Sequence, residues 1–210
     1  MNAATEFFLM ASSKIELEYF KEIEYRRESS FEKCTPEIFF SEYIYAILNL
    51  GMREQAMRPI YDKFMDSLDI NDIKTRFPTK QRTAAKAGID NFVRWFGELK
   101  CAKDPVSYLQ TLPLIGKTTK WHLAQNIGID CVKPDRHLIR LSERFGFKTP
   151  LEMCEQIKAD IGDAEKVSVI DLILWRYCNL FGSNAENNIT EKRLEKVNNH
   201  KISDFWSNEQ

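Results

Sequence analysis

An acidic residue that follows a lysine and a proline is the strongest candidate for chemistry in this sequence. Residues 132–137 read VKPDRH, so Asp135 follows Pro134 at the expected start of a helix and lies between Lys133 and Arg136. The helix dipole and the two cations favour the ionised carboxylate at such a position. A carboxylate held there can cap the helix, or it can stabilise positive charge that develops on a reacting group.

A second candidate site lies just upstream of Asp135, in a segment whose pattern is typical of backbone that binds phosphate. Residues 105–127 read as a short helix, a turn with the sequence LPLIG at 112–116, and a second helix that begins at Lys117. In such a helix-hairpin-helix the N–H groups of the turn and of the second helix start point at one phosphate, which binds duplex DNA without reading its sequence. Gly116 lets the backbone approach closely.

The order of these two features carries a resemblance to a known superfamily. The hairpin is followed by a helix that runs to Gly128, then by a loop with Gly and Pro, and then by Asp135. This order resembles the helix-hairpin-helix superfamily of DNA base-excision glycosylases. The run DRHLIRL at 135–141 is similar to the sequence around the catalytic aspartate in its endonuclease-III-like branch. The resemblance implies an all-α fold with two helical lobes and a cleft between them, Asp135 as the catalytic carboxylate, and no cofactor.

The same resemblance implies which residues contact double-stranded DNA. At the hairpin these are Leu114, Gly116, Lys117, Thr118, Thr119 and Lys120. Leu114 departs from the pattern, because the hairpin usually has glycine there. Asn49 or Leu50 is the candidate wedge that fills the gap left by a flipped base, since such a residue needs a firm turn. A helix that ends near Gly51 with a capping Asn is the alternative.

Members that also cleave the strand carry a lysine two residues after the hairpin glycine, where its amine forms a Schiff base. Here that position is Thr118. We therefore expect a monofunctional glycosylase that hydrolyses the N-glycosidic bond and leaves an abasic site. The alternatives are a bifunctional glycosylase/lyase that uses Lys117 or Lys120, and a non-catalytic DNA-binding protein that uses the hairpin alone.

Aromatic residues are candidates for the base pocket, because a flipped base stacks on aromatic rings. We consider Tyr45, Trp121, Trp175 and His137. For the aromatic residues, burial in the core is the alternative. Nothing in the sequence identifies which base is removed.

Proline and capping residues mark the starts of several predicted helices. The predicted helices are 13–28, 36–49, 52–68, 79–97, 105–111, 116–127, 135–145, 150–160 and 164–181. We expect one lobe from residues 1–35 and 146–182, a second lobe from 36–145 with the hairpin and the Asp135 loop (128–137), and a polar tail at 183–210. The helix at 164–181 is apolar nearly all round, which predicts a buried central helix.

Charge and composition support a DNA-binding protein. Residues 74–148 hold 15 Lys and Arg against 6 Asp and Glu, although the whole chain has a net charge of −1. Such a segment suits a polyanion, although a solvated basic surface is the alternative. No apolar run approaches the roughly 20 residues of a membrane span. We expect a cytoplasmic monomer, associated with the nucleoid in a prokaryote. The five cysteines are too scattered to predict a metal site, an iron–sulfur cluster or disulfides.

Overall fold

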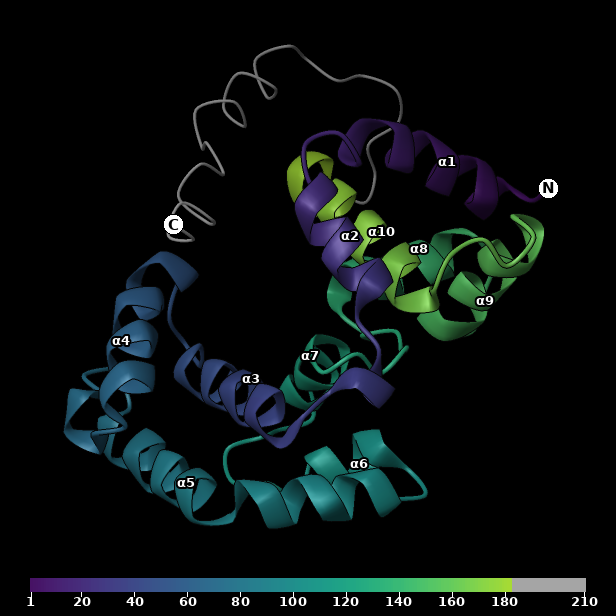
Figure 1. Ribbon diagram of the computed structural model, residues 1–210. Helices are drawn as coiled ribbons and strands as arrows, with labels where there is room; N and C mark the ends of the chain where they lie inside the picture. The colour runs from purple at the N-terminus through teal and green to yellow at the C-terminus, as the bar shows by residue number, and fades with distance from the viewer. Residues whose placement is uncertain (183–210) are drawn as a thin grey trace. The chain divides into compact units, whose positions relative to one another are not determined.

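The computed structural model describes residues 1–182, which are helical with no strand among them (Figure 1). The prediction of an all-α protein is confirmed. The chain divides into two compact units. Within the described residues, the first unit comprises Met1–Ile23 and 134–182, and the second comprises Glu24–Lys133. No helix in the described part is long and apolar enough to cross a membrane.

The boundaries of the units differ from those expected at 35/36 and 145/146. They lie at Ile23/Glu24 and Lys133/Pro134, so Asp135 and the helix that follows it belong to the first unit. The reason is packing, because this helix (α8, Arg136–Arg144) contacts α9 (Pro150–Asp160) and α10 (Val167–Phe181). The tail expected at 183–210 lies outside the described residues.

The first unit is built around α10, which packs against α1 (Ala3–Ile15), α8 and α9. Eleven of the fifteen residues of α10 are buried, as expected for a central helix. The N-terminal region differs from the predicted helix at 13–28. It forms α1 and α2 (Phe20–Glu28), and α1 begins at Ala3 because Asn2 caps it by accepting a hydrogen bond from the Thr5 N–H at 2.9 Å. The predicted helix at 13–28 took no account of a capping residue as far upstream as Asn2.

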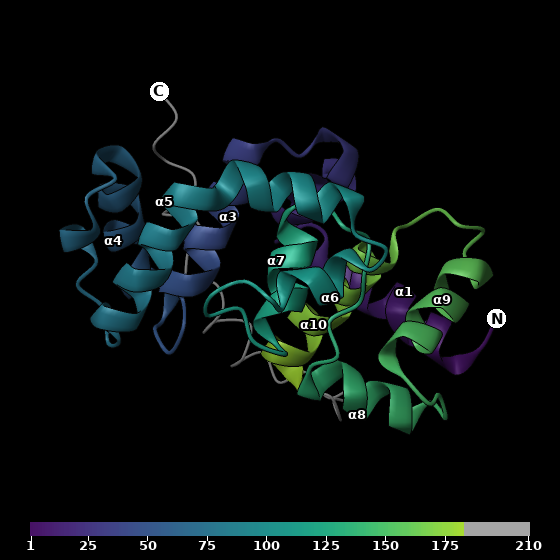
Figure 2. The ribbon, with the colours of Figure 1, turned by 90° about the horizontal axis from the view of Figure 1, so that it is seen from below.

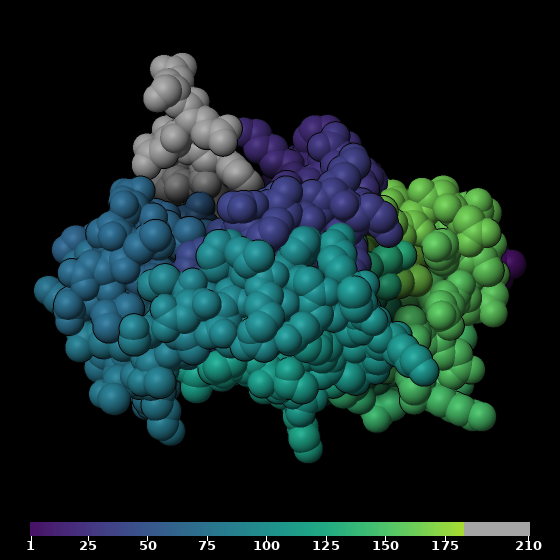
Figure 3. Space-filling model, turned by 60° about the horizontal axis from the view of Figure 1, so that its bottom comes forward, coloured from purple at the N-terminus to yellow at the C-terminus, as the bar shows by residue number. Residues whose placement is uncertain are grey.

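The second unit is built around α3 (Pro36–Leu48), which packs against α4 (Glu54–Ser67), α5 (Pro78–Cys101) and α7 (Thr119–Asn126). Its remaining described elements are the last five residues of α2, together with η1 (Phe31–Lys33), η2 (Ile70–Asp72) and α6 (Pro105–Leu109). Figure 2 shows α6 and α7 side by side, and Figure 3 shows the outer surface of α5 in teal. The buried face of α3 forms the centre of this core.

Local capping explains why three predicted helices begin where they do. Thr35, Asp104 and Thr149 each accept a backbone N–H three residues ahead, and a proline follows each of them at the first helical position. These side chains satisfy donors that a helix start leaves unpaired, and proline has no N–H to lose there. The predicted starts at 36, 105 and 150 therefore match the structure.

One buried tyrosine joins three elements of the second unit. Tyr43 on α3 is fully buried, and its hydroxyl lies 3.0 Å from the carbonyl oxygen of Pro113 in the hairpin turn and 3.3 Å from that of Ala84 on α5. Its ring occupies space that Gly88 leaves open, since a Cβ on Gly88 would lie 2.8 Å from Tyr43 Cε1. The missing side chain at Gly88 therefore lets Tyr43 reach the hairpin.

Two glycines of α5 make a matched test of this packing. Gly88→Ala is expected to destabilise the fold by about 1–3 kcal/mol, because the new methyl group displaces a fully buried ring. Gly97→Ala is expected to stabilise the fold by about 0.5–1 kcal/mol, because an added Cβ meets nothing within 4 Å and alanine favours a helix. Urea unfolding of both variants measures the difference, and a Gly88→Ala variant as stable as Gly97→Ala would contradict the packing argument.

Candidate functional site

The hairpin turn is attached to the core by its apolar residues, and its other residues face outward. Leu112 and Ile115 are buried, whereas Pro113 and Gly116 are exposed. The turn is closed by a hydrogen bond from the Ile115 N–H to the Leu112 carbonyl oxygen at 3.1 Å. The turn is therefore rigid on one side and accessible on the other.

Leu114 adopts the backbone conformation that the usual glycine would adopt. Its φ is +60°, in the left-handed region, which costs an ordinary residue roughly 1–2 kcal/mol. The half-buried side chain packs against the core, which offsets part of this cost. The departure from the hairpin pattern thus changes the side chain and keeps the left-handed turn.

The predicted phosphate-binding residues lie at the start of α7. Gly116, Lys117 and Thr118 are exposed, and Thr119 is the first residue of the helix. The N–H of Lys120 donates to the Gly116 carbonyl oxygen at 3.1 Å, so the N–H groups of residues 117–119 precede this first bonded turn. A Cβ on Gly116 would meet nothing within 4 Å, and its φ is not positive. Internal packing therefore does not require glycine at 116, and the prediction that a phosphate approaches the backbone there stays a prediction.

The helix after the hairpin ends at a close contact between two backbone segments. Gly128 has φ +86°, and a Cβ there would lie 2.5 Å from the carbonyl carbon of Ser30. Only glycine allows both the conformation and the approach. This glycine fixes where the loop that leads to Asp135 leaves α7.

Asp135 is the N-cap of α8. Its Oδ1 accepts hydrogen bonds from the N–H groups of His137 at 2.8 Å and Leu138 at 3.0 Å. Its other carboxylate oxygen has no hydrogen-bond partner within the described part of the first unit. One oxygen thus fixes the carboxyl group, and the second remains able to face a substrate. The capping and catalytic interpretations of Asp135 are compatible.

The candidate wedge lies where α3 ends. Asn49 is the C-cap of α3, with its N–H donating to the Tyr45 carbonyl oxygen at 3.1 Å, and both Asn49 and Leu50 are half-buried. Phe77 was not considered in the sequence, but its ring packs against this turn, 3.1 Å from the position that a Cβ on Gly51 would take. Asn49 thus acts as the cap of α3. That Asn49 or Leu50 serves as the wedge stays a prediction.

The four residues predicted to line the base pocket have different surroundings, and they do not all lie in the same unit. Tyr45 on α3 is half-buried, and its hydroxyl donates to Glu54. Trp121 lies under the Lys120 ammonium, 5.3 Å from its ring centroid. Trp175 and His137 belong to the first unit, where Trp175 stacks with the guanidinium of Arg176 at 4.9 Å and His137 has a buried Nδ1 without a hydrogen-bond partner in the described residues.

The structure adds His122, which the sequence analysis left without a role. The His122 ring lies 6.1 Å from that of Tyr45, and its Nε2 is buried without a hydrogen-bond partner among the described residues. Burial, followed by the charges of Lys133 and Arg26, lowers the pKa of His122 to about 4, so the ring is neutral at physiological pH. Helical spacing could have found it, because His122 is one turn after Thr118.

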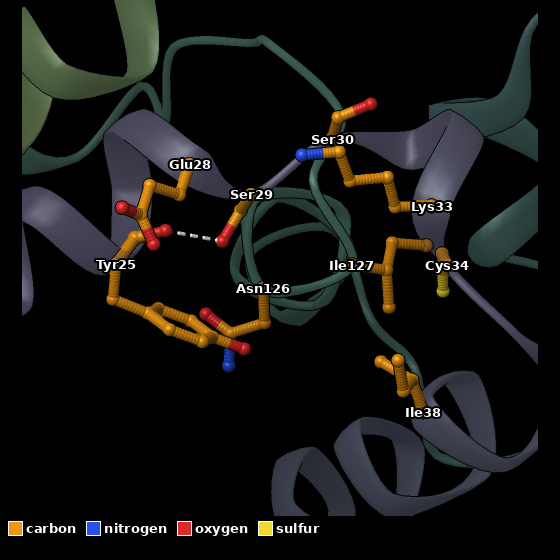
Figure 4. Close-up of a pocket in the computed structure, with 9 residues that line it drawn as sticks. All are labelled: Tyr25, Glu28, Ser29, Ser30, Lys33, Cys34, Ile38, Asn126 and Ile127. Atoms are coloured by element: carbon orange, nitrogen blue, oxygen red, sulfur yellow. Dashed lines mark hydrogen bonds between the residues drawn. The ribbon is translucent and has the colours of Figure 1, made fainter.

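A separate pocket of about 290 Å³ lies between the end of α2, η1 and the end of α7 (Figure 4). Its lining includes Lys33, Cys34 and Asn126. Burial raises the pKa of the Cys34 thiol to about 11, so this thiol is protonated and a poor nucleophile. None of the residues predicted as site residues lines this pocket, so we assign it no part in the chemistry.

The cysteines provide no metal centre in the described part of the chain. Cys34, Cys131, Cys154 and Cys178 are buried, and Cys101 is exposed at the end of α5. No cluster of three or more His, Cys, Asp or Glu side chains suited to a metal ion occurs among residues 1–182. Burial raises the pKa of Cys178 to about 12, with Asp135 as the next contribution.

Because the hairpin is exposed, substitutions in it should change the binding of DNA without changing the fold. Combining Gly116→Val with Lys117→Ala should weaken binding to every duplex and reduce the slope of log affinity against log salt by roughly one unit for the lost charge contact. Fluorescence anisotropy across a salt series measures this slope, with Lys21→Ala as a charge-matched control in the first unit. Unmodified duplex bound as tightly as before would remove the hairpin from the interface.

Comparison with known proteins bears on the fold. No family model matches the sequence, and no curated protein matches it. Among solved structures, the chain is similar to the 8-oxoguanine glycosylase/lyase of Methanocaldococcus jannaschii, in complex with a 15mer DNA containing 8-oxoguanine. The identity is 19%, the TM-score is 0.57, and the match covers 80% of this chain and 95% of the other. The chain therefore has the all-helical fold of a DNA glycosylase.

Proposed function

We propose that this protein is a DNA glycosylase that flips a damaged or modified base out of duplex DNA and hydrolyses its N-glycosidic bond. The observation that carries the proposal is the position of Asp135 as the N-cap of a helix, downstream of an exposed hairpin, in a chain with the fold of a DNA glycosylase. Double-stranded DNA is the partner, and the structural neighbour was solved in complex with DNA.

The geometry of Asp135 suits stabilisation of an oxocarbenium-like sugar. Cleavage of the bond builds positive charge on the sugar, and a fixed carboxylate beside it stabilises this charge and orients water. The N–H groups of His137 and Leu138 donate to Oδ1, which fixes the direction of the carboxyl group. Oδ2 then faces the sugar or the water. The product is an abasic site.

The residue Thr118 supports hydrolysis without cleavage of the DNA strand. A hydroxyl group cannot form a Schiff base, and Thr118 occupies the position from which the lyase amine attacks. The second candidate is a bifunctional enzyme, because the structural neighbour is described as a glycosylase/lyase and Lys117 and Lys120 flank Thr118. Lys117 is exposed before the helix, whereas Lys120 lies against Trp121. A non-catalytic DNA-binding protein would need Asp135 only as the cap of α8.

Asp135→Asn tests the chemistry while preserving the helix start, because asparagine caps as well as aspartate. Base release should fall at least about a hundredfold with DNA affinity retained or improved, since a negative charge is lost without a change in size. Alkali-induced strand breaks in duplexes with 8-oxoguanine, hypoxanthine, 3-methyladenine, mismatched adenine or 5-hydroxymethyluracil measure release. Asp69→Asn changes a different capping aspartate and should leave the rate unchanged. Near-native turnover by Asp135→Asn would refute this role.

Strand cleavage distinguishes hydrolysis from lyase chemistry. The wild type should leave intact abasic strands that break only after alkali, and borohydride should trap no covalent adduct with DNA. Thr118→Lys should gain weak strand cleavage, provided that the new amine is desolvated enough to be neutral. If the wild type is instead trapped by borohydride, Lys117→Ala and Lys120→Ala identify the nucleophile.

A further inference from the structure

One face of the second unit brings polar side chains of α3 and α7 together. Asn126 on α7 donates to Glu42 on α3 at 2.7 Å, and Tyr45, one turn further along α3, donates to Glu54. Burial raises the pKa of Glu42, so its hydrogen bond with Asn126 offsets part of the cost of removing that group from water. Glu42 and Tyr45 on this face thus have protein partners.

His122 differs from these neighbours. Its Nε2 is buried and has no hydrogen-bond partner in the described part of the chain, which is costly unless a water or a ligand supplies one. Its ring is tilted by 36° to that of Tyr45 at a centroid distance of 6.1 Å, so two rings and one unsatisfied nitrogen lie together. Tyr45 also meets Tyr61 edge-on at 5.7 Å, which limits its movement.

The position of His122 relates it to the hairpin and to the loop that ends at Asp135. His122 is four residues after Thr118, so the two share one face of the helix start. The charge of Lys133 acts on the His122 ring, and Lys133 precedes Asp135 by two residues in the chain. A group bound at His122 therefore lies within the electrostatic influence of Lys133, the last residue of the second unit.

We infer that His122 and Tyr45 form a recognition site for the extruded base, in which Nε2 of His122 makes one hydrogen bond to the base edge and the Tyr45 ring provides a stacking surface. The inference rests on the proposed function and adds a specificity-determining residue to it. The ring remains neutral near pH 7, because burial, followed by the charges of Lys133 and Arg26, lowers its pKa. The Nε2 of a neutral imidazole can make one hydrogen bond to a donor or an acceptor on the base edge, and the ring adds no charge to the site.

Two substitutions separate hydrogen bonding from packing. His122→Phe keeps a ring against Tyr45 and removes the nitrogen, whereas His122→Gln places an amide near the position of Nε2. Both are made in the Asp135→Asn protein so that the base stays attached during the measurement. Fluorescence anisotropy then gives affinities for a duplex with the base that the wild type releases fastest from the panel above, and for the same duplex with a tetrahydrofuran abasic analogue.

The base-containing duplex should bind His122→Phe roughly 10- to 100-fold more weakly, the effect of losing one hydrogen bond that leaves its partner unpaired. The abasic duplex should bind within about twofold of the parent, because it presents no base edge, and His122→Gln should recover part of the lost affinity. Thermal unfolding of each variant shows whether the fold is retained. A purely structural histidine would affect both duplexes alike and would not be rescued by Gln.

Failure of the inference is distinguishable from failure of the proposed function. If base release depends on Asp135 but all three forms of residue 122 bind both duplexes equally, the function stands and the recognition role of His122 is refuted. Equal weakening on both duplexes refutes that role as well. If the wild type releases no base from any duplex of the panel, or if release does not depend on Asp135, the proposed function is refuted and the inference with it.

Discussion

The hydroxyl of Tyr43 holds the hairpin to the core of its unit. It lies within hydrogen-bond distance of the Pro113 carbonyl oxygen in the turn, and the ring is fixed by the gap at Gly88 and by an edge-on contact with Trp95. The buried side chains of Leu112 and Ile115 attach the same turn to the core, so the left-handed Leu114 is held from both sides. The start of α7, and with it His122, depends on the same contact, because α7 follows this turn directly.

Capping plays a similar part at Asp135. Two backbone N–H groups fix the carboxylate through one oxygen, so the helix start itself supplies the rigidity that a catalytic group needs. Gly128 determines where the preceding loop leaves α7, since no other residue fits against Ser30. Backbone geometry at a few positions, more than a network of side chains, therefore presents the two candidate groups within their units.

Local signals in the sequence predicted much of the helical content, and tertiary packing decided the rest. Thr35, Asp104 and Thr149 identify their helices because a cap and the following proline act within four residues. The unit boundaries were misplaced, because contacts between α8 and α10 decide the unit to which Asp135 belongs, and no local pattern encodes them. The pairing of His122 with Tyr45 was missed for the same reason. Their roles in base recognition remain predictions.

The distribution of the cysteines has a practical consequence. Four of the five thiols are buried, and burial keeps Cys34 and Cys178 protonated at neutral pH. Thiol reagents attack the exposed thiolate form, so they should react with Cys101 at the end of α5 far faster than with the buried thiols. Cys101 thus offers an attachment point for a maleimide dye in the unaltered sequence, and labelled DNA would let single-molecule energy transfer follow the second unit as it meets a duplex.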